Sequence, residues 1–174
     1  DYDTFKVHNG FRSPGEVKFA DFGMPKSEVY RGKYEPFRHR VNFRLKRISA
    51  GDEALFTNTT FAFVCIDDGE ARDEICTMLI RLGIPFIDTG IGVEKEGGKL
   101  DGLIRTTLFT PETASAALDR VPRDAQKGDA YRVLVQIAEL NALNAALAVI
   151  RYKQHRGYYA DDERWTCIYR AKHA

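Results

Sequence analysis

The chain has 174 residues, of which 44% are hydrophobic and 29% are charged, and its formal net charge is +1. This composition is ordinary for one globular domain with a sizeable core, and it excludes disordered and collagen-like chains. No apolar run approaches the roughly 18 residues of a membrane-spanning helix, and no signal peptide is visible. We therefore expect a single domain over residues 1–174 and no membrane partner.

The cysteines indicate the compartment. Cys65, Cys76 and Cys167 are odd in number, form no CxxC pair and lie far apart in the sequence. This pattern favours reduced, buried thiols over a disulfide framework or a zinc site. We therefore expect a cytoplasmic protein in which Cys65 and Cys76 are inert packing residues.

The small net charge hides an uneven distribution along the chain. Residues 1–50 carry 11 Lys and Arg against 6 Asp and Glu, whereas residues 51–130 carry 8 against 15. The basic first third could contact a phosphate or an acidic partner. The plainer alternative is a solvated surface.

The first part of the chain predicts one helix and two strands. A short helix is expected over 26–38, because Pro25 stands just before it and Pro36 lies near its end. Residues 41–49 alternate apolar and polar side chains, which predicts a strand. The run FAFVCID at 61–67 is continuously apolar, which is typical of a strand buried on both faces in the centre of a sheet.

The next stretch predicts a βαβ unit. A helix is expected over 67–83, where apolar residues recur at helical spacing: Ile75, Met78, Leu79 and Leu82. Asp67 or Asp68 can cap its first turn, and Gly83 suits its C-terminus. Residues 85–92 predict another strand. Two strands joined by a helix in this way run parallel in one sheet.

The remaining chain predicts a turn and strand over 97–110, a polar connection over 111–130, a long helix over 136–157 and a short strand over 165–173. The predicted fold class is α/β. We expect a Rossmann-like, mostly parallel sheet with helices on both faces and an antiparallel addition at its C-terminal side.

Residues suited to phosphate and metal chemistry occur in an ordered set. D-x-D is followed by H-N-x-x-R, by a Pro-Lys pair at a helix start, and by C-x-D-D-x-x-x-R after the apolar strand; the residues are Asp1, Asp3, Asn9, Arg12, Lys26, Cys65, Asp67, Asp68 and Arg72. With the helix around QIAELNALNAAL, this set resembles the ThiF/MoeB-like adenylyltransferases, which include the activating enzymes of ubiquitin and ubiquitin-like proteins. The segments HNGFRSPG and QHRGYYADDERWTCIY look like the bacterial branch that accompanies ubiquitin-like modification genes. The resemblance spans essentially the whole chain.

The resemblance implies an activity and a set of roles. The activity is ATP-dependent adenylation of the C-terminal carboxylate of a ubiquitin-like or sulfur-carrier protein, with ATP and Mg²⁺ as cofactors. Asp1 would bind the ribose, Asn9, Arg12 and Lys26 the phosphates, and Asp67 the Mg²⁺. Arg12, Lys26 and Asp67 would be the catalytic residues, because the reaction brings negative groups together and requires cations. Arg72 would support the Asp67 carboxylate. The resemblance also implies a homodimer, and no nucleic acid partner is expected.

Each of these residues has a plainer interpretation. The aspartates could be turn residues or helix caps, Asn9 a loop former, and Arg12 and Lys26 solvated charges. Two other function classes also stay open. One is a dinucleotide-binding oxidoreductase domain, and the other is a non-catalytic dimerising interaction module.

The sequence departs from the family pattern in two places. The family's glycine-rich phosphate loop and first βα unit precede Asp1, so we expect this chain alone to bind ATP weakly or not at all and to be inactive. The pairs Gly90/Gly92 and Gly97/Gly98 open no helix, so they are predicted to be turns and not replacements for that loop. No cysteine occurs in 110–133, where ubiquitin-activating relatives carry their thioester nucleophile. Thiol transfer is therefore not supported.

Overall fold

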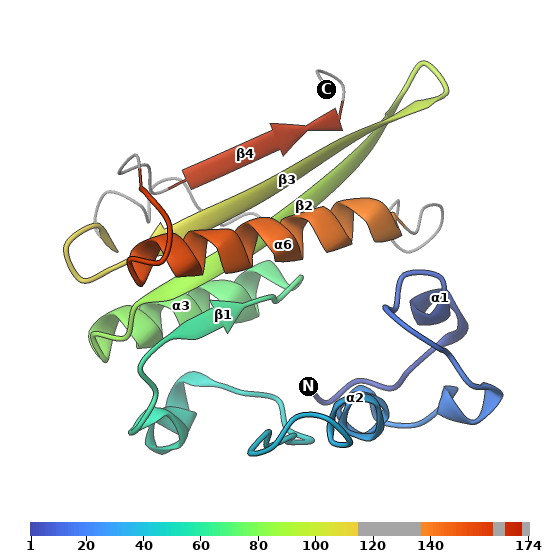
Figure 1. Cartoon of the computed structure of the whole chain (residues 1–174), viewed down its shortest axis with the longest axis horizontal. Coiled ribbons are helices and arrows are strands. Elements are labelled where there is room, and N and C mark those ends of the chain that lie inside the picture. Colours follow the sequence, from blue (N-terminus) through green and yellow to red (C-terminus); the bar gives the residue numbers. More distant parts are fainter. Residues whose placement is uncertain (115–136, 162–165, 172–174) are drawn as a thin grey trace. The chain divides into compact units, whose positions relative to one another are not determined.

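The computed structural model of the chain describes residues 1–114, 137–161 and 166–171. The chain divides into two compact units (Figure 1). The first consists of Asp1–Ile48 with the residues around Ile137, and the second of the chain from Ser49 onward. Each unit is described by itself.

The first unit contains three short helices: α1 (Val7–Gly10), the 3-10 helix η1 (Phe19–Asp21) and α2 (Lys26–Tyr34). Its start is fixed against the beginning of α2 by backbone hydrogen bonds. The Phe5 N–H donates to the Met24 carbonyl at 2.7 Å, and the Lys26 N–H donates to the Asp3 carbonyl at 2.9 Å. The Phe5 ring is fully buried and lies 6.4 Å from the Tyr30 ring. This small aromatic core holds the acidic N-terminal segment beside the first turn of α2.

Two predictions for this unit need correction. The helix expected over 26–38 ends at Tyr34, before Pro36. The strand expected over 41–49 is wrong, because these residues form no regular secondary structure. Val41 and Leu45, which should have faced a core, are 46% and 57% exposed. Apolar alternation alone does not make a strand, and none of the described strands pairs with this segment.

The second unit is built on one sheet. Its elements are η2 (Ala50–Phe56), β1 (Ala62–Val64), α3 (Gly69–Arg81), β2 (Phe86–Glu96), β3 (Lys99–Phe109), α6 (Ala138–His155) and β4 (Thr166–Arg170). The four strands lie in the order β1-β2-β3-β4. Among these strands, β1 and β2 run parallel, whereas β2–β3 and β3–β4 are antiparallel. The connection expected over 111–130 lies mostly outside the described residues.

The expected Rossmann-like, mostly parallel sheet is therefore wrong: the described sheet is mostly antiparallel. The predicted parallel pairing around α3 is confirmed. The difference arises at Gly97 and Gly98, whose φ angles are +57° and +82°. Two successive residues in this region form the tight turn of a β-hairpin, and Glu96 pairs with Lys99 across it. The antiparallel hairpin of β2 and β3 is thus the main part of the sheet and not an addition to it.

The apolar run at 61–67 also differs from its prediction. Its strand, β1, lies at an edge of the described sheet and not at the centre, and Phe63 is 45% exposed. Cys65, one residue beyond this strand, is exposed, as is Cys167. Cys76 is buried as expected. The prediction of buried thiols is therefore wrong for two of the three cysteines.

Helices α3 and α6 contact opposite faces of the sheet (Figure 1). Neighbouring residues of a strand point to opposite faces. Ile87 packs with Ala148 of α6, whereas its neighbour Asp88 faces Arg72 of α3. A polar link also joins α6 to the sheet: buried Asn144 accepts a hydrogen bond from the Thr106 hydroxyl at 3.0 Å and donates one to the Gly90 carbonyl at 3.0 Å. No helix within the described ranges is long and apolar enough to cross a membrane.

Candidate functional site

The first unit contains an open pocket of about 390 Å³ at the start of α2. This volume is within the range of small-molecule sites. The pocket is lined by Asp1, Lys26, Ser27, Tyr30, Tyr34, Asn42, Phe43 and Arg44. Two of the predicted site residues, Asp1 and Lys26, thus line the same pocket, together with a second cation and three aromatic rings.

Ser27 is a pocket residue that the sequence analysis missed. It is only 6% exposed, and its hydroxyl has no hydrogen-bond partner among the described residues. It lies in the first turn of a nine-residue helix whose preceding Pro25 provides no side-chain cap. The N-terminus of a helix carries a partial positive charge and favours anions. A serine directly after a Pro-Lys helix start was the sequence signal that could have identified it.

The ammonium group of Lys26 already has a partner. Its Nζ donates to Oδ2 of Asp3 at 2.6 Å, and this hydrogen bond is the main cause that lowers the pKa of Asp3. Asp1 in turn accepts a hydrogen bond from the Asp3 N–H through its Oδ1, at 2.9 Å. A phosphate at this pocket would therefore share Lys26 with Asp3.

Asn9 and Arg12 do not line the pocket. Asn9 is 5% exposed, and its Oδ1 accepts a hydrogen bond from the Lys6 N–H at 2.8 Å, so the side chain stabilises the short helix α1. Arg12 is partly buried. His8 directly precedes Asn9 in the sequence, and desolvation, followed by the positive charges of Arg12, Lys6 and Lys26, lowers the pKa of His8. This stretch is therefore electrically positive, but phosphate binding by Asn9 and Arg12 stays a prediction.

Asp67 lies in the second unit, between β1 and α3. Its neighbour Asp68 is the helix cap, because the Asp68 Oδ1 accepts a hydrogen bond from the Ala71 N–H at 2.8 Å. Asp67 is exposed, and its carboxylate contacts no hydrogen-bond or ion-pair partner among the described residues. Mg²⁺ commonly takes one or two protein carboxylates, with water and substrate phosphates completing its shell. A single unpaired carboxylate fits that pattern, and the described residues contain no cluster of three or more His, Cys, Asp or Glu side chains for a metal held by protein alone.

A buried ion-pair network lies next to this loop. Asp88 on β2 is fully buried, and its Oδ2 accepts a hydrogen bond from Nη2 of Arg105 on β3 at 2.6 Å. Its Oδ1 lies 3.5 Å from Nε of Arg72 on α3. Arg72 also donates from Nε and Nη2 to the carbonyl of Ile66, at 3.0 and 2.5 Å. Burial raises the pKa of Asp88, and the two guanidinium groups oppose that shift. The network joins the end of β1 to the interior of the sheet.

The absence of a side chain at Gly90 leaves room for the Arg105 guanidinium of this network. A Cβ on Gly90 would lie 2.9 Å from Nη2 of Arg105, so the guanidinium occupies the space that a side chain would fill. Gly90 and Gly92 are inside β2, and the prediction that they form a turn is wrong. The turn predicted at Gly97 and Gly98 is confirmed.

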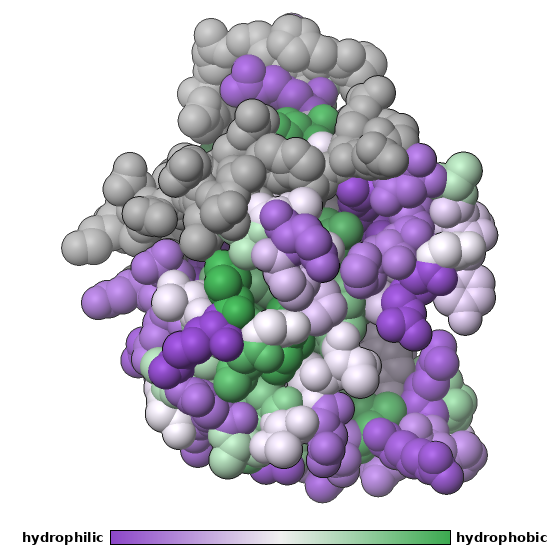
Figure 2. Space-filling model, turned by 90° about the vertical axis from the view of Figure 1, so that its left-hand side faces the viewer, coloured by the Kyte–Doolittle hydropathy of each residue, from purple (hydrophilic) through white to green (hydrophobic). Residues whose placement is uncertain are grey.

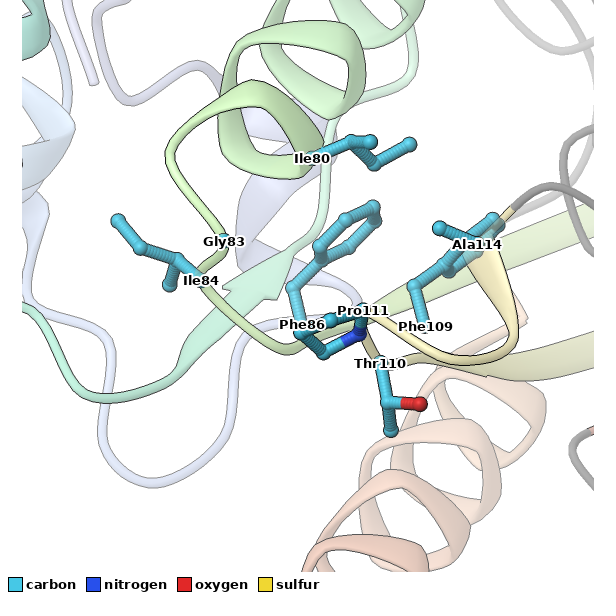
Figure 3. Close-up of a pocket in the computed structure, with 8 residues that line it drawn as sticks. All are labelled: Ile80, Gly83, Ile84, Phe86, Phe109, Thr110, Pro111 and Ala114. Carbon is cyan, nitrogen blue, oxygen red and sulfur yellow. The ribbon is translucent and has the colours of Figure 1, made fainter.

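A second cavity, at the ends of α3 and β3, is too small to be a ligand site (Figure 3). Its volume is about 10 Å³, and its lining is mostly apolar. Phe86 and Phe109 stack there with ring centroids 4.5 Å apart. The face shown in Figure 2 also exposes hydrophobic residues, which lie between hydrophilic side chains.

The chain matches no protein-family model and no curated protein.

Proposed function

We propose that this chain functions in the ATP-dependent adenylation of the C-terminal carboxylate of a ubiquitin-like or sulfur-carrier protein. The observation that carries the proposal is the pocket of the first unit. There Asp1 and Lys26, two members of the ordered motif set, line one space with Arg44 and with the unpartnered hydroxyl of Ser27. A carboxylate for a ribose, cations for phosphates and aromatic rings for a base are the groups that nucleotide recognition requires.

In the proposed reaction, an oxygen of the carrier's C-terminal carboxylate forms a bond to the α-phosphorus of ATP. The bond from that phosphorus to the bridging oxygen breaks, and pyrophosphate leaves with the bond's electron pair. The carboxylate is already ionised, so no general base is needed. Negative charge builds on the phosphate oxygens, and fixed cations and hydrogen-bond donors stabilise it.

The proposal gives each site residue one task. Asp1 holds the ribose, and Lys26, with Arg12 and Asn9, contacts the phosphates. The Ser27 hydroxyl donates to a phosphate oxygen, which supplies the partner it lacks. Asp67, in the second unit, would be the protein ligand for Mg²⁺, an ion that supplies positive charge in this chemistry.

The test is ATP–pyrophosphate exchange by the full-length gene product, driven by a carrier protein with a free C-terminal carboxylate. Arg12→Ala and Lys26→Ala should each lower the exchange rate by about 10²-fold or more, because both remove a contact that strengthens in the transition state. Lys18→Ala is the matched control, since Lys18 is exposed and does not line the pocket. Exchange at the wild-type rate by both variants, with unchanged unfolding midpoints, would refute the assignment.

The oxidoreductase alternative has lost its structural argument. It depends on an acidic residue that follows a strand of a parallel, dinucleotide-binding sheet and binds the nicotinamide ribose, and the described sheet has one parallel pair. The interaction-module alternative keeps a specific observation, because the outer side of α6 exposes apolar residues: Leu143, Val149 and Ile150.

We propose that a second copy of the chain covers these exposed apolar residues of α6, because exposed apolar surface often marks an interface between copies. Sedimentation equilibrium at high micromolar concentration should give a dimer, and Ile150→Glu should shift it towards monomer. Val7→Glu, which changes an exposed residue of the first unit, is the control. A dimer without any exchange activity would favour the interaction module, and a strict monomer would exclude the proposed interface.

A further inference from the structure

We infer that residues 38–47 form a docking surface for an extended, acidic segment of a partner protein. We call these residues the basic segment, because they contain no Asp or Glu and five cations: Arg38, Arg40, Arg44, Lys46 and Arg47. All five residues are exposed. The inference goes beyond the proposed adenylation and does not depend on it.

The cations of the basic segment lack acidic partners within the chain. Arg38, Arg40 and Arg44 form no ion pair with any described residue, whereas Lys26 of the same unit pairs with Asp3 at 2.6 Å. Neighbouring cations without counter-charges repel one another, and an acidic partner relieves that repulsion. Charge complementarity of this kind steers association and selects the partner, so the partner surface is acidic.

The backbone of the basic segment has no neighbour. No backbone hydrogen bond joins residues 41–45 to the backbone of another described residue, although the Arg44 carbonyl accepts a hydrogen bond from the amino group of Asp1 at 3.3 Å. Val41 and Leu45 are 46% and 57% exposed. Exposed backbone groups next to exposed, alternating side chains are what a strand added from another chain binds.

The sequence of the basic segment specifies what the added strand must carry. Side chains at odd and even positions of a strand lie on opposite faces. The odd positions 41, 43 and 45 are apolar, and the even positions carry four of the five cations: Arg38, Arg40, Arg44 and Lys46. Opposite side chains of paired strands lie about 5 Å apart. A strand that alternates carboxylates with aliphatic residues therefore matches both faces.

The exposed apolar residues also favour a protein over a nucleic acid. Sites for single-stranded nucleic acid combine cations with aromatic rings on which bases stack. The alternating side chains that are most exposed here, Val41 and Leu45, are aliphatic, and aliphatic side chains pack against the side chains of a neighbouring strand.

The experiment titrates the full-length gene product, without ATP, with a blocked octapeptide of alternating glutamate and valine. Calorimetry should show binding that weakens as the salt concentration rises, and an octapeptide of alternating lysine and valine should not bind. Amide hydrogen exchange, followed by NMR, should slow at alternate residues of 41–47 when the glutamate peptide is present. Only alternate N–H groups of a strand face one neighbour, so attraction between charges alone would not produce this pattern.

The double substitution Arg38→Glu/Arg40→Glu tests the charges. It should raise the Kd of the glutamate peptide by about 10-fold or more, because it replaces two attractions with repulsions. Lys18→Glu is the matched control, since Lys18 is an exposed cation of the same unit outside the basic segment. It should leave the Kd within about twofold.

The double substitution Val41→Ser/Leu45→Ser tests the apolar face and keeps every charge. It should also raise the Kd of the glutamate peptide by about 10-fold, because it removes two aliphatic contacts. Val7→Ser, at a residue of the same unit that is 64% exposed, is its control. All of these side chains are exposed, so the unfolding midpoints of the variants should stay close to that of the wild type.

Binding of the glutamate peptide without slower exchange in 41–47 would refute strand addition, and equal binding of the lysine peptide would refute charge complementarity. Tighter binding of an oligothymidylate of equal charge would replace the protein segment with a nucleic acid. If the glutamate peptide does not bind at all, the inference is wrong. None of these measurements involves ATP or pyrophosphate exchange, so their outcomes leave the proposed function to its own test.

Discussion

The substitution Ser27→Ala tests whether the Ser27 hydroxyl binds a ligand or only supports the fold. The hydroxyl is buried with no partner among the described residues, and such a group costs about 1–3 kcal/mol of folding free energy. Alanine removes that cost, and it is also the better helix former by about 0.5 kcal/mol. We expect Ser27→Ala to raise the free energy of unfolding by about 1–2 kcal/mol. For a chain of this length, that corresponds to an unfolding midpoint about 2–8 °C higher.

The same substitution should weaken ligand binding. A hydrogen bond to a charged group contributes about 1.5–3 kcal/mol, so the Kd for tripolyphosphate or ATP should rise by about 10- to 150-fold. The two effects have opposite signs. A residue that only supports the fold would lose stability and affinity together.

The assays are thermal unfolding and calorimetric titration with tripolyphosphate, both on the full-length gene product. Ser13→Ala is the matched control, because the Ser13 hydroxyl has partners in Tyr30 Oη and Lys33 Nζ, each at 3.2 Å. That control should lose about 1 kcal/mol of stability. If Ser27→Ala is destabilised as much as Ser13→Ala, or if its tripolyphosphate affinity equals that of the wild type, the hydroxyl is not the anion donor proposed here.

Three further predictions concern the rest of the chain. Asn144→Ala should lower the free energy of unfolding by about 2–4 kcal/mol, because it leaves the Thr106 hydroxyl and the Gly90 carbonyl without their partner. The control Asn141→Ala, one turn earlier, should change it by less than about 0.5 kcal/mol. Equal effects of the two substitutions in denaturant unfolding would contradict the role of Asn144 in joining α6 to the sheet. Burial raises the pKa of the Cys76 thiol to about 12. At pH 8, iodoacetamide should therefore label the two exposed cysteines in the native protein and Cys76 only after unfolding, as measured by mass spectrometry. Fast labelling of Cys76 in the native protein would contradict its burial. The pKa of His8 is lowered from its ordinary 6.5, so the folded state binds a proton at His8 less tightly than the unfolded chain does. The stability that His8 contributes is therefore complete above the pKa of the unfolded state, and it is lost as the pH falls through the pKa of the folded state. His8→Gln should remove this part of the acid dependence, and an unchanged pH profile would show that His8 is not its source.

The sequence alone determined the features that depend on neighbours along the chain. Helix α3 was predicted from its apolar spacing, from an aspartate before its first turn and from a glycine after its last turn. In the structure the helix spans Gly69–Arg81, Asp68 is its cap, and Gly83 has a φ of +66°. The Gly97-Gly98 turn was predictable for the same reason, since two residues with positive φ specify a hairpin locally. The long helix α6 followed from its apolar periodicity.

Tertiary structure decided the features that depend on residues far apart in the sequence. The apolar run at 61–67 has the composition of a central strand, yet its place at an edge is set by which strands pair with it. The Asp88–Arg105 pair joins residues 17 positions apart, and it exists because β2 and β3 are antiparallel in a register that brings both side chains to one face of the sheet. The unpartnered state of the Ser27 hydroxyl is likewise not encoded locally, because it depends on what the folded chain places around it. Periodicity and turn chemistry act over a few residues, whereas strand order, register and the burial of single polar atoms are set by the packing of the whole unit.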